Sequence, residues 1–208
     1  MTIHTLTTHF INQLRPRLRY EPQRYWNSRI DPNNDVGRSP VIVNRHVSYI
    51  RSHLNGPGPF LEYGPGVGRT IHAYPSGTHV HTLDISRIYG DALRQRAVDA
   101  GIALHERHAE DPTAPFPYAD KQFATAVTSQ VLLHVPPSSI RHVIRELLRV
   151  SECVVVISSY THARATNYGS AYCFNHDYLT LFSEEGCCLD SLRSENGTLY
   201  FLARQAPC

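Results

Sequence analysis

Short apolar runs alternate with amphipathic segments along most of the chain after residue 58. The apolar runs have the length of β-strands and lie at residues 59–63, 78–85, 102–108, 123–129 and 153–159. Two amphipathic segments, 86–101 and 137–150, lie between successive runs. Strands that alternate with helices predict right-handed βαβ units on a largely parallel sheet.

The second amphipathic segment has a clear helical period. Pro137 followed by Ser138 and Ser139 is typical of a helix start. The apolar residues that follow recur at helical spacing, at Ile140, Val143, Ile144, Leu147 and Leu148. We therefore predict an amphipathic helix over 137–150.

The last part of the chain breaks the alternation of strands and helices. The segments "CCLDSLRSE" (187–195) and "TLYFLAR" (198–204) flank Asn196 and Gly197, which together give a strong hairpin signal. We therefore predict an α/β, Rossmann-like, doubly wound fold. Its seven-stranded sheet is mostly parallel and ends in an antiparallel C-terminal hairpin.

The first 55 residues differ from the rest of the chain. They contain helical-looking pieces interrupted by "NSRIDPNNDVGRSP" (27–40), a loop rich in Asn, Asp, Pro and Gly. We interpret residues 1–55 as an N-terminal helical lid segment and residues 56–208 as the main domain. The two parts are expected to form one structural unit.

The composition is that of a soluble globular protein of 208 residues, with 41% apolar and 18% charged residues. The net charge is only +2 and no basic run is visible, so the sequence does not indicate a nucleic-acid partner. The five cysteines form no CxxC pair, which favours reduced thiols in a cytoplasmic protein. No apolar stretch has the length of a signal peptide core or a membrane span, so neither is expected.

The first strand runs into an unusual glycine turn in "FLEYGPGVGRT" (60–70). Gly64, Gly66 and Gly68 leave open backbone at the carboxyl end of the sheet, where α/β folds bind ligands. The spacing GxGxG differs from the dinucleotide pattern, and no Lys-Ser/Thr pair follows as in a P-loop. The turn therefore suits a small anionic group such as an amino-acid carboxylate. A turn that needs glycine only for chain packing is the alternative.

The second strand ends in an acidic residue, Asp84, in "HTLDIS". A carboxylate at this place can accept hydrogen bonds from both hydroxyls of a ribose. The alternative is that Asp84 caps a helix that starts near Ser86, although Ser86 can fill that role itself. We favour ribose binding, because the strand, the glycine turn and the acidic strand end occur in this order.

Several segments together resemble the successive motifs of class I S-adenosylmethionine-dependent methyltransferases. They are "LEYGPGVGRT", "LDIS", "APFPYADKQFATAVTSQVLLHVPP" and "RELLRVSECVVVISS", within a resemblance that covers roughly residues 59–205. The resemblance implies an enzyme that uses S-adenosyl-L-methionine. It makes residues 56–208 the cofactor-binding methyltransferase domain.

The resemblance also implies which residues hold the methionine end of the cofactor. Glu62 would order the first loop or meet the methionine amino group, with Tyr63 beside it. Gly64 and Gly66 would line the methionine moiety. Gln130, which follows the fourth strand, would lie beside the transferable methyl group.

For the nucleoside end, the resemblance assigns Asp84 to the ribose hydroxyls and Ile85 to the adenine face. Many members of the family have an acidic residue for the adenine amino group just before an alanine. In this chain "RHAED" places His108 there, so the sequence departs from the pattern. Ala109 is then expected to offer its backbone and Glu110 to supply the acceptor.

Two of the thirteen histidines are candidate general bases. A hydroxyl acceptor must lose its proton during methyl transfer, and histidine is the natural base near neutral pH. His134 follows the fourth strand, and its alternative role is to orient that loop. His176 follows the fifth strand beside Asp177, and its alternative is a position at a helix start. The other histidines lack a metal-ligand spacing, so no metal site is expected.

The acceptor is the least defined part of the prediction. Aromatic residues that can wall a pocket occur in two segments, at Tyr25, Trp26, Tyr160, Tyr168 and Tyr172, although core aromatics would give the same pattern. We predict methylation of a small molecule, at oxygen rather than nitrogen. The alternatives are methylation of RNA or protein, and a catalytically silent domain that binds the cofactor.

Overall fold

The structure is a computed structural model that describes residues 20–28, 39–159 and 172–206. Its centre is a seven-stranded sheet with the order β3-β2-β1-β4-β5-β7-β6. The strands are β1 (Phe60–Tyr63), β2 (His79–Asp84), β3 (Ala103–His108), β4 (Thr125–Ser129), β5 (Cys153–Ser159), β6 (Cys187–Glu195) and β7 (Thr198–Gln205). Strands β1 to β5 pair in parallel, whereas β7 is antiparallel to both β5 and β6. The predicted fold class is confirmed.

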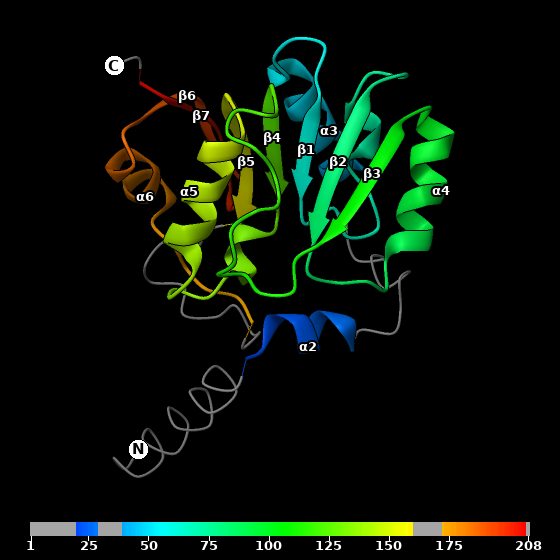
Figure 1. Cartoon of the computed structure of the whole chain (residues 1–208). Helices are drawn as coiled ribbons and strands as arrows, with labels where there is room; N and C mark the ends of the chain where they lie inside the picture. Colours follow the sequence, from blue (N-terminus) through cyan, green and yellow to red (C-terminus); the bar gives the residue numbers. More distant parts are fainter. Residues whose placement is uncertain (1–19, 29–38, 160–171, 207–208) are drawn as a thin grey trace.

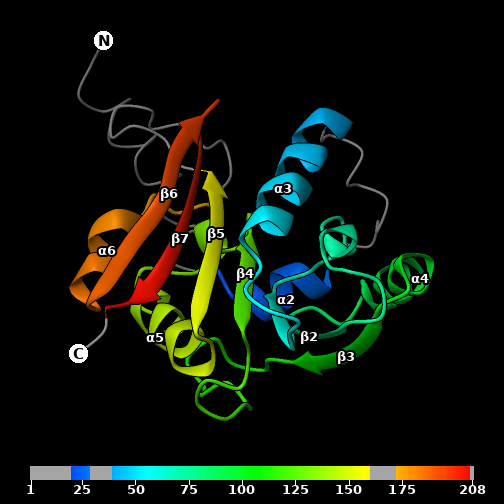
Figure 2. The same ribbon diagram turned by 90° about the horizontal axis from the view of Figure 1, so that it is seen from above.

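Helices cover both faces of this sheet (Figure 2). Helices α5 (Ile140–Val150) and α6 (Tyr178–Glu184) lie on one face, and α3 (Pro40–His53) and α4 (Gly90–Ala100) lie on the other. Each face has its own cluster of buried apolar side chains. The other helices in the described ranges are α2 (Pro22–Asn27) and the short 3₁₀ helices η2 (Ile71–Ala73) and η3 (Leu132–His134).

Helix α5 has the amphipathic character that its sequence predicts. Its apolar positions are all buried in the cluster beneath the helix: Ile140, Val143, Ile144, Leu147 and Leu148. The helix begins at Ile140 with Ser139 as its N-cap, slightly later than predicted. The hairpin between β6 and β7 is also confirmed, with positive φ values of 50° at Asn196 and 72° at Gly197.

Helix α4 begins at Gly90, four residues later than the predicted segment 86–101. The difference arises because the residues after β2 form a turn instead of a first helical turn. The backbone N–H of Ser86 donates to the Asp84 carboxylate at 2.8 Å, and the N–H of Arg87 donates to the Asn27 side chain at 2.9 Å. Tyr89, not Ser86 or Asp84, occupies the N-cap position of α4.

Helix α2 lies across the carboxyl ends of the central strands (Figure 1). Besides the Asn27 contact, the Ser86 hydroxyl donates to the Trp26 carbonyl at 3.4 Å. At the other end of α2, the Tyr20 hydroxyl donates to the His134 carbonyl at 3.1 Å. The helix therefore connects the loop after β2 with the loop after β4, above the edge of the sheet where a ligand is expected.

Two other sequence predictions concern the aromatic wall of the pocket and membrane-spanning segments. Tyr160 and Tyr168, two of the aromatic residues expected to wall a pocket, lie outside the described residues. Within the described ranges, no helix combines the length and the apolar character needed to cross a membrane.

Candidate functional site

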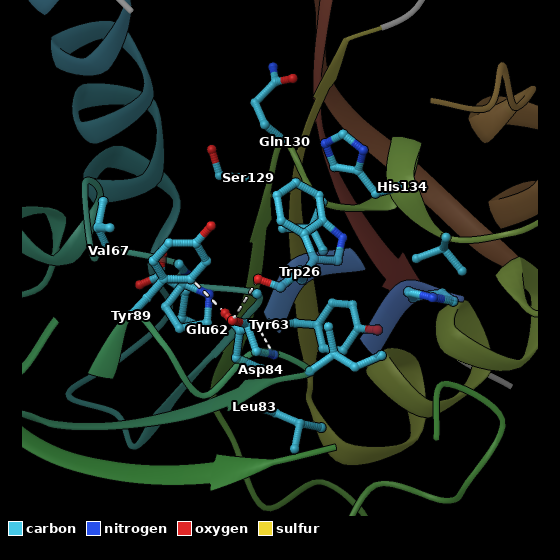
Figure 3. A pocket seen from close by; sticks show the side chains of 18 of the residues that line it. Trp26, Glu62, Tyr63, Val67, Leu83, Asp84, Tyr89, Ser129, Gln130 and His134 are labelled. Atoms are coloured by element: carbon cyan, nitrogen blue, oxygen red, sulfur yellow. Dashed lines mark hydrogen bonds between the residues drawn. The ribbon is translucent and has the colours of Figure 1, made fainter. Parts of the chain in front are cut away.

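A cavity of about 550 Å³ opens at the carboxyl ends of β1, β2 and β4, and residues of α2 form part of its wall. Its lining contains most of the residues predicted from the sequence to form the site: Glu62, Tyr63, Gly64, Gly66, Asp84, Ile85, Gln130 and His134. Figure 3 shows Trp26, Gln130 and His134 together at one end and Glu62, Asp84 and Tyr89 at the other. The parallel strands and their following loops thus bring residues from distant parts of the chain to one cavity.

The glycine turn has the packing role that its sequence left open, and it also leaves open space at one position. A Cβ on Gly64 would lie 2.5 Å from Val131, and one on Gly68 would lie 2.7 Å from Leu93, so packing excludes a side chain at both. Gly66 is different. It has a φ of 52°, and no described atom lies within 4 Å of the position of its Cβ. The turn is therefore tightly packed at Gly64 and Gly68 and leaves open space at Gly66.

Glu62 is a buried carboxylate at the wall of the cavity, with 1% of its surface exposed. The Thr70 hydroxyl donates to its Oε1, whereas its Oε2 has no hydrogen-bond partner among the described residues. Burial raises the pKa of Glu62 to about 7, and Thr70 and Tyr74 oppose this rise. No hydrogen bond of normal geometry joins Tyr74 to Glu62, because the Tyr74 hydroxyl also lacks a partner. A cationic ligand would therefore find an acceptor here.

Asp84 joins the glycine turn to the loop after β2. The Gly66 N–H donates to its Oδ2 at 3.0 Å, and the Ser86 N–H donates to its Oδ1 at 2.8 Å. Burial raises the pKa of Asp84, and these backbone donors oppose the rise. Since α4 starts only at Gly90, Asp84 does not cap a helix. Two carboxylate oxygens offer about four acceptor positions, so two remain for a ligand.

Gln130 follows β4 in a left-handed backbone conformation, with a φ of 60°. Its N–H donates to the Ile157 carbonyl at 2.7 Å. Its side-chain oxygen accepts from the Ser159 hydroxyl at 2.6 Å and from the Ser159 N–H at 3.2 Å. The backbone donor identifies this atom as the amide oxygen, so the amide NH₂ is the end that can donate to a ligand.

His134 ends η3 and lines the cavity beside Trp26. Its Nδ1 lies 2.9 Å from the Tyr172 carbonyl oxygen, and its ring lies 4.8 Å from the Trp26 ring at an interplanar angle of 72°. Because a carbonyl oxygen only accepts, Nδ1 must carry the proton of this hydrogen bond. In the neutral imidazole the lone pair then belongs to Nε2.

Residues 60–152 match the family model of the methyltransferase domain. This region is a methyltransferase domain, the domain of an enzyme. No curated protein sequence matches the chain.

Solved methyltransferase structures share the fold over most of the chain. The magnesium protoporphyrin IX methyltransferase from Synechocystis PCC 6803 with bound S-adenosylhomocysteine has a TM-score of 0.67 at 17% identity, covering 88% of this chain and 98% of that one. A putative methyltransferase in complex with the Trm112 activator of Haloferax volcanii has a TM-score of 0.67 at 13% identity, covering 90% and 99%. An O-methyltransferase family protein from Burkholderia thailandensis has a TM-score of 0.61 at 11% identity, covering 80% and 55%. At these identities the likeness concerns the fold.

Three residues predicted at the adenine end of this methyltransferase domain do not line the cavity: His108, Ala109 and Glu110. The Ala109 N–H donates to the Asp84 carbonyl at 2.9 Å, and Glu110 pairs with Arg87 at 3.1 Å. These contacts fasten the end of β3 to the loop after β2. Their predicted contact with adenine stays a prediction.

His176, the other candidate base, does not line the cavity either. Its Nε2 lies 2.9 Å from the Val135 carbonyl oxygen, and burial lowers its pKa. Asp177 beside it caps α6 by accepting from the Thr180 N–H at 3.1 Å. This arrangement resembles the position at a helix start that the sequence left as the alternative.

The sequence did not single out three polar residues of the cavity wall, Tyr20, His46 and Ser129. His46 on α3 lies 3.3 Å from the Ser129 hydroxyl at the end of β4, a contact across 83 residues that no local pattern signals. Tyr20 lies shortly before the aromatic pair Tyr25 and Trp26. The argument that aromatic residues of this segment can wall a pocket therefore applied to Tyr20 as well. Among the described residues, no group of three or more His, Cys, Asp or Glu side chains is arranged to hold a metal ion.

Proposed function

We propose that the protein transfers a methyl group from S-adenosyl-L-methionine to a small molecule, at oxygen rather than nitrogen. One observation carries the proposal. A histidine whose proton is held on Nδ1 by a backbone carbonyl lines the same cavity as an open glycine turn and a buried carboxylate, one oxygen of which has no hydrogen-bond partner among the described residues. The first feature suits removal of a hydroxyl proton, and the other two suit an amino-acid ligand with a nucleoside.

The residues present fit the cofactor. The unpartnered Oε2 of Glu62 suits the ammonium group of the methionine end, since a buried carboxylate is costly without a partner. Gly66 gives open space for close approach of the ligand to the backbone. Asp84 keeps acceptor positions for the two ribose hydroxyls, and Ile85 offers an apolar wall for adenine.

When bound, the cofactor supplies a methyl group that its sulfonium already activates. The chain has to align the acceptor and take its proton. We place the acceptor hydroxyl at Nε2 of His134, because the Tyr172 carbonyl holds the proton on Nδ1. With the methyl group supplied by the bound cofactor, the acceptor oxygen would exchange its proton for the methyl group, and Nε2 of His134 would take that proton, so charge and atoms balance. Helix α2 above the cavity would limit the access of water.

A small-molecule acceptor is supported by the dimensions of the site. A cavity of about 550 Å³ is in the range of small-molecule pockets, roughly 300–1,000 Å³. The Synechocystis neighbour is a methyltransferase of a porphyrin, and the Burkholderia neighbour belongs to an O-methyltransferase family. Methylation of RNA is not supported, because the net charge is only +2 and the sequence contains no basic run.

The test is turnover with a panel of alcohols, phenols and amines, followed through the S-adenosylhomocysteine formed. His134→Ala should lower turnover on a hydroxyl acceptor roughly 10²–10⁴-fold, the usual contribution of a general base, while cofactor affinity stays nearly unchanged. His176→Ala is the comparison, because His176 lies outside the cavity.

Loss of turnover only in His176→Ala would place the base after β5 and make His134 structural. Equal turnover in both variants, with amines as the accepted substrates, would contradict oxygen methylation. Normal cofactor binding without methylation of any acceptor would instead favour a catalytically silent domain.

A further inference from the structure

Five aromatic side chains form a connected group beside His134, which contacts three of them: Tyr20, Trp26 and Tyr172. Tyr25 and Tyr172 stack with ring centroids 3.7 Å apart, and Tyr20 lies 5.4 Å from Tyr172 and 5.8 Å from Phe174. Trp26 lies 5.0 Å from Tyr25 and borders His134. We call these five residues (Tyr20, Tyr25, Trp26, Tyr172 and Phe174) the aromatic cluster.

The aromatic cluster is not part of the hydrophobic core. All five side chains are only half-buried, and none belongs to either of the two clusters of buried apolar residues. Helix α2, which carries Tyr25 and Trp26, has no fully buried residue. The cavity lining therefore includes three rings that do not serve to close the core: Tyr20, Tyr25 and Trp26.

The polar atoms of two of these rings, Trp26 and Tyr20, donate to protein partners. The Trp26 indole N–H donates to the Tyr20 hydroxyl at 3.1 Å, and that hydroxyl donates to the His134 carbonyl at 3.1 Å. Burial raises the pKa of Tyr20 well above its usual range, so this hydroxyl keeps its proton at any assay pH. Tyr20 and Trp26 are thus held by their polar atoms, and the rings of Tyr20, Tyr25 and Trp26 form part of the cavity wall.

Charge is distributed unevenly along the cavity. Its carboxylates and guanidinium among the described residues are Glu62, Arg69 and Asp84, all on β1, β2 or the glycine turn. The end with the aromatic cluster carries histidines, apolar side chains and small polar groups. A permanently charged acceptor would therefore lie without an ionic partner, which is costly in a buried site.

An aromatic cage for a cation is also not formed. Such a cage needs several ring faces directed at one point. Tyr25 and Tyr172 instead stack on each other, with an interplanar angle of 28°. Flat apolar surface beside a histidine suits a flat, neutral ligand better than an ammonium group.

We propose that the acceptor is an uncharged, planar ring system with a phenol-type hydroxyl, which packs against Trp26 with its hydroxyl at His134. This inference rests on the proposed function and adds the substrate class. The acidity of the hydroxyl agrees with it, since a phenol with a pKa of about 10 loses its proton to histidine more readily than an aliphatic alcohol does.

The experiment uses the full chain saturated with S-adenosylhomocysteine and four bicyclic probes. These are naphthol, its saturated counterpart decahydronaphthol, anionic naphthoate and a cationic naphthylalkylamine. The chain has one tryptophan, so an N–H correlation spectrum contains one indole signal, and it reports on Trp26 directly. Naphthol should shift this signal in a saturable way and bind more tightly than each of the other three probes.

Substitutions then test whether the ring of Trp26 is responsible. Trp26→Leu should weaken naphthol binding, measured by equilibrium dialysis, roughly 2- to 12-fold, the range for an aromatic pair, while Trp26→Phe should retain most of it. Phe174→Leu is the matched control, because Phe174 belongs to the cluster but does not line the cavity. It should leave naphthol affinity unchanged.

The inference is overturned if decahydronaphthol, naphthoate or the amine binds as tightly as naphthol, or if Trp26→Leu binds naphthol as the natural chain does. Should Trp26→Leu fail to fold, an equal loss of naphthol affinity in Trp26→Phe and Phe174→Leu would also overturn it. These outcomes leave the proposed function intact when S-adenosylhomocysteine itself binds. Absence of S-adenosylhomocysteine binding is the separate result that contradicts the proposed function.

Discussion

Replacement of Glu62 by glutamine should stabilise the free protein and weaken cofactor binding at the same time. The carboxylate is buried, its Oε2 has no hydrogen-bond partner in the part of the chain that the structure describes, and burial raises its pKa from 4.5 to about 7. Glutamine has nearly the same shape and can still accept the hydrogen bond from Thr70. It carries no charge, however, so it removes the cost of burying one.

The magnitude follows from the pKa. Between pH 4.5 and about 7 the folded protein keeps a proton on Glu62 that the unfolded chain has lost. The contribution of Glu62 to stability is therefore fully present below pH 4.5, falls as the pH rises, and is lost above about 7. A shift of this size corresponds to about 3 kcal/mol, at 1.36 kcal/mol per pKa unit. Glu62→Gln should raise the free energy of unfolding by up to this amount at about pH 8.

Binding should change in the opposite direction. A hydrogen bond to a charged group contributes about 1.5–3 kcal/mol, so Glu62→Gln should weaken S-adenosylhomocysteine binding roughly 10- to 150-fold. The natural chain should also release a proton on binding below about pH 7, because the ligand ammonium favours the ionised Glu62. Calorimetric titration in two buffers of different ionisation enthalpy measures both quantities.

Urea unfolding of the free protein at several pH values completes the assay. The stability difference between Glu62→Gln and the natural chain should shrink as the pH is lowered toward 4.5. A variant that is less stable at about pH 8 and binds the ligand with unchanged affinity would refute the reasoning. Glu62 would then serve only to hold the glycine turn through Thr70.

Two further substitutions test the glycine turn and its neighbour. Asp84→Ala should weaken S-adenosylhomocysteine binding by roughly 1.5–3 kcal/mol in a calorimetric titration with a native circular dichroism spectrum, and unchanged affinity with a lowered melting temperature would make Asp84 purely structural. Gly64→Ala should destabilise the fold by roughly 1–3 kcal/mol in urea unfolding, because its new methyl group meets Val131. Val131→Ala should recover part of that loss in the double variant, and strictly additive losses would contradict the packing explanation.

Much of the fold could be predicted because local patterns of apolar and turn residues indicate its strands, helices and hairpin. The alternation of apolar runs and amphipathic segments identified β1 to β5, and Asn196 with Gly197 identified the hairpin. The start of α4 could not be predicted in this way. The turn before Gly90 is held by Asp84 and by Asn27 on α2, and these contacts are tertiary.

The candidate site was predicted best where strands end. Glu62, Asp84 and Gln130 all lie at the carboxyl end of a parallel strand, so the topology alone brings them together. His46 reaches the cavity from α3, through packing that has no sequence signal. The proposed acceptor end of the cavity depends on the position of α2 across the strand ends. The sequence indicated α2 only as part of a lid segment.

The central claim is that this cavity binds the methyl donor, and calorimetric titration of the natural chain with S-adenosylhomocysteine tests it most directly. The account predicts saturable binding, no binding of nicotinamide dinucleotides, and a stabilisation of about 2.7 kcal/mol at a hundredfold excess over Kd. Binding of NAD together with no binding of S-adenosylhomocysteine would contradict it.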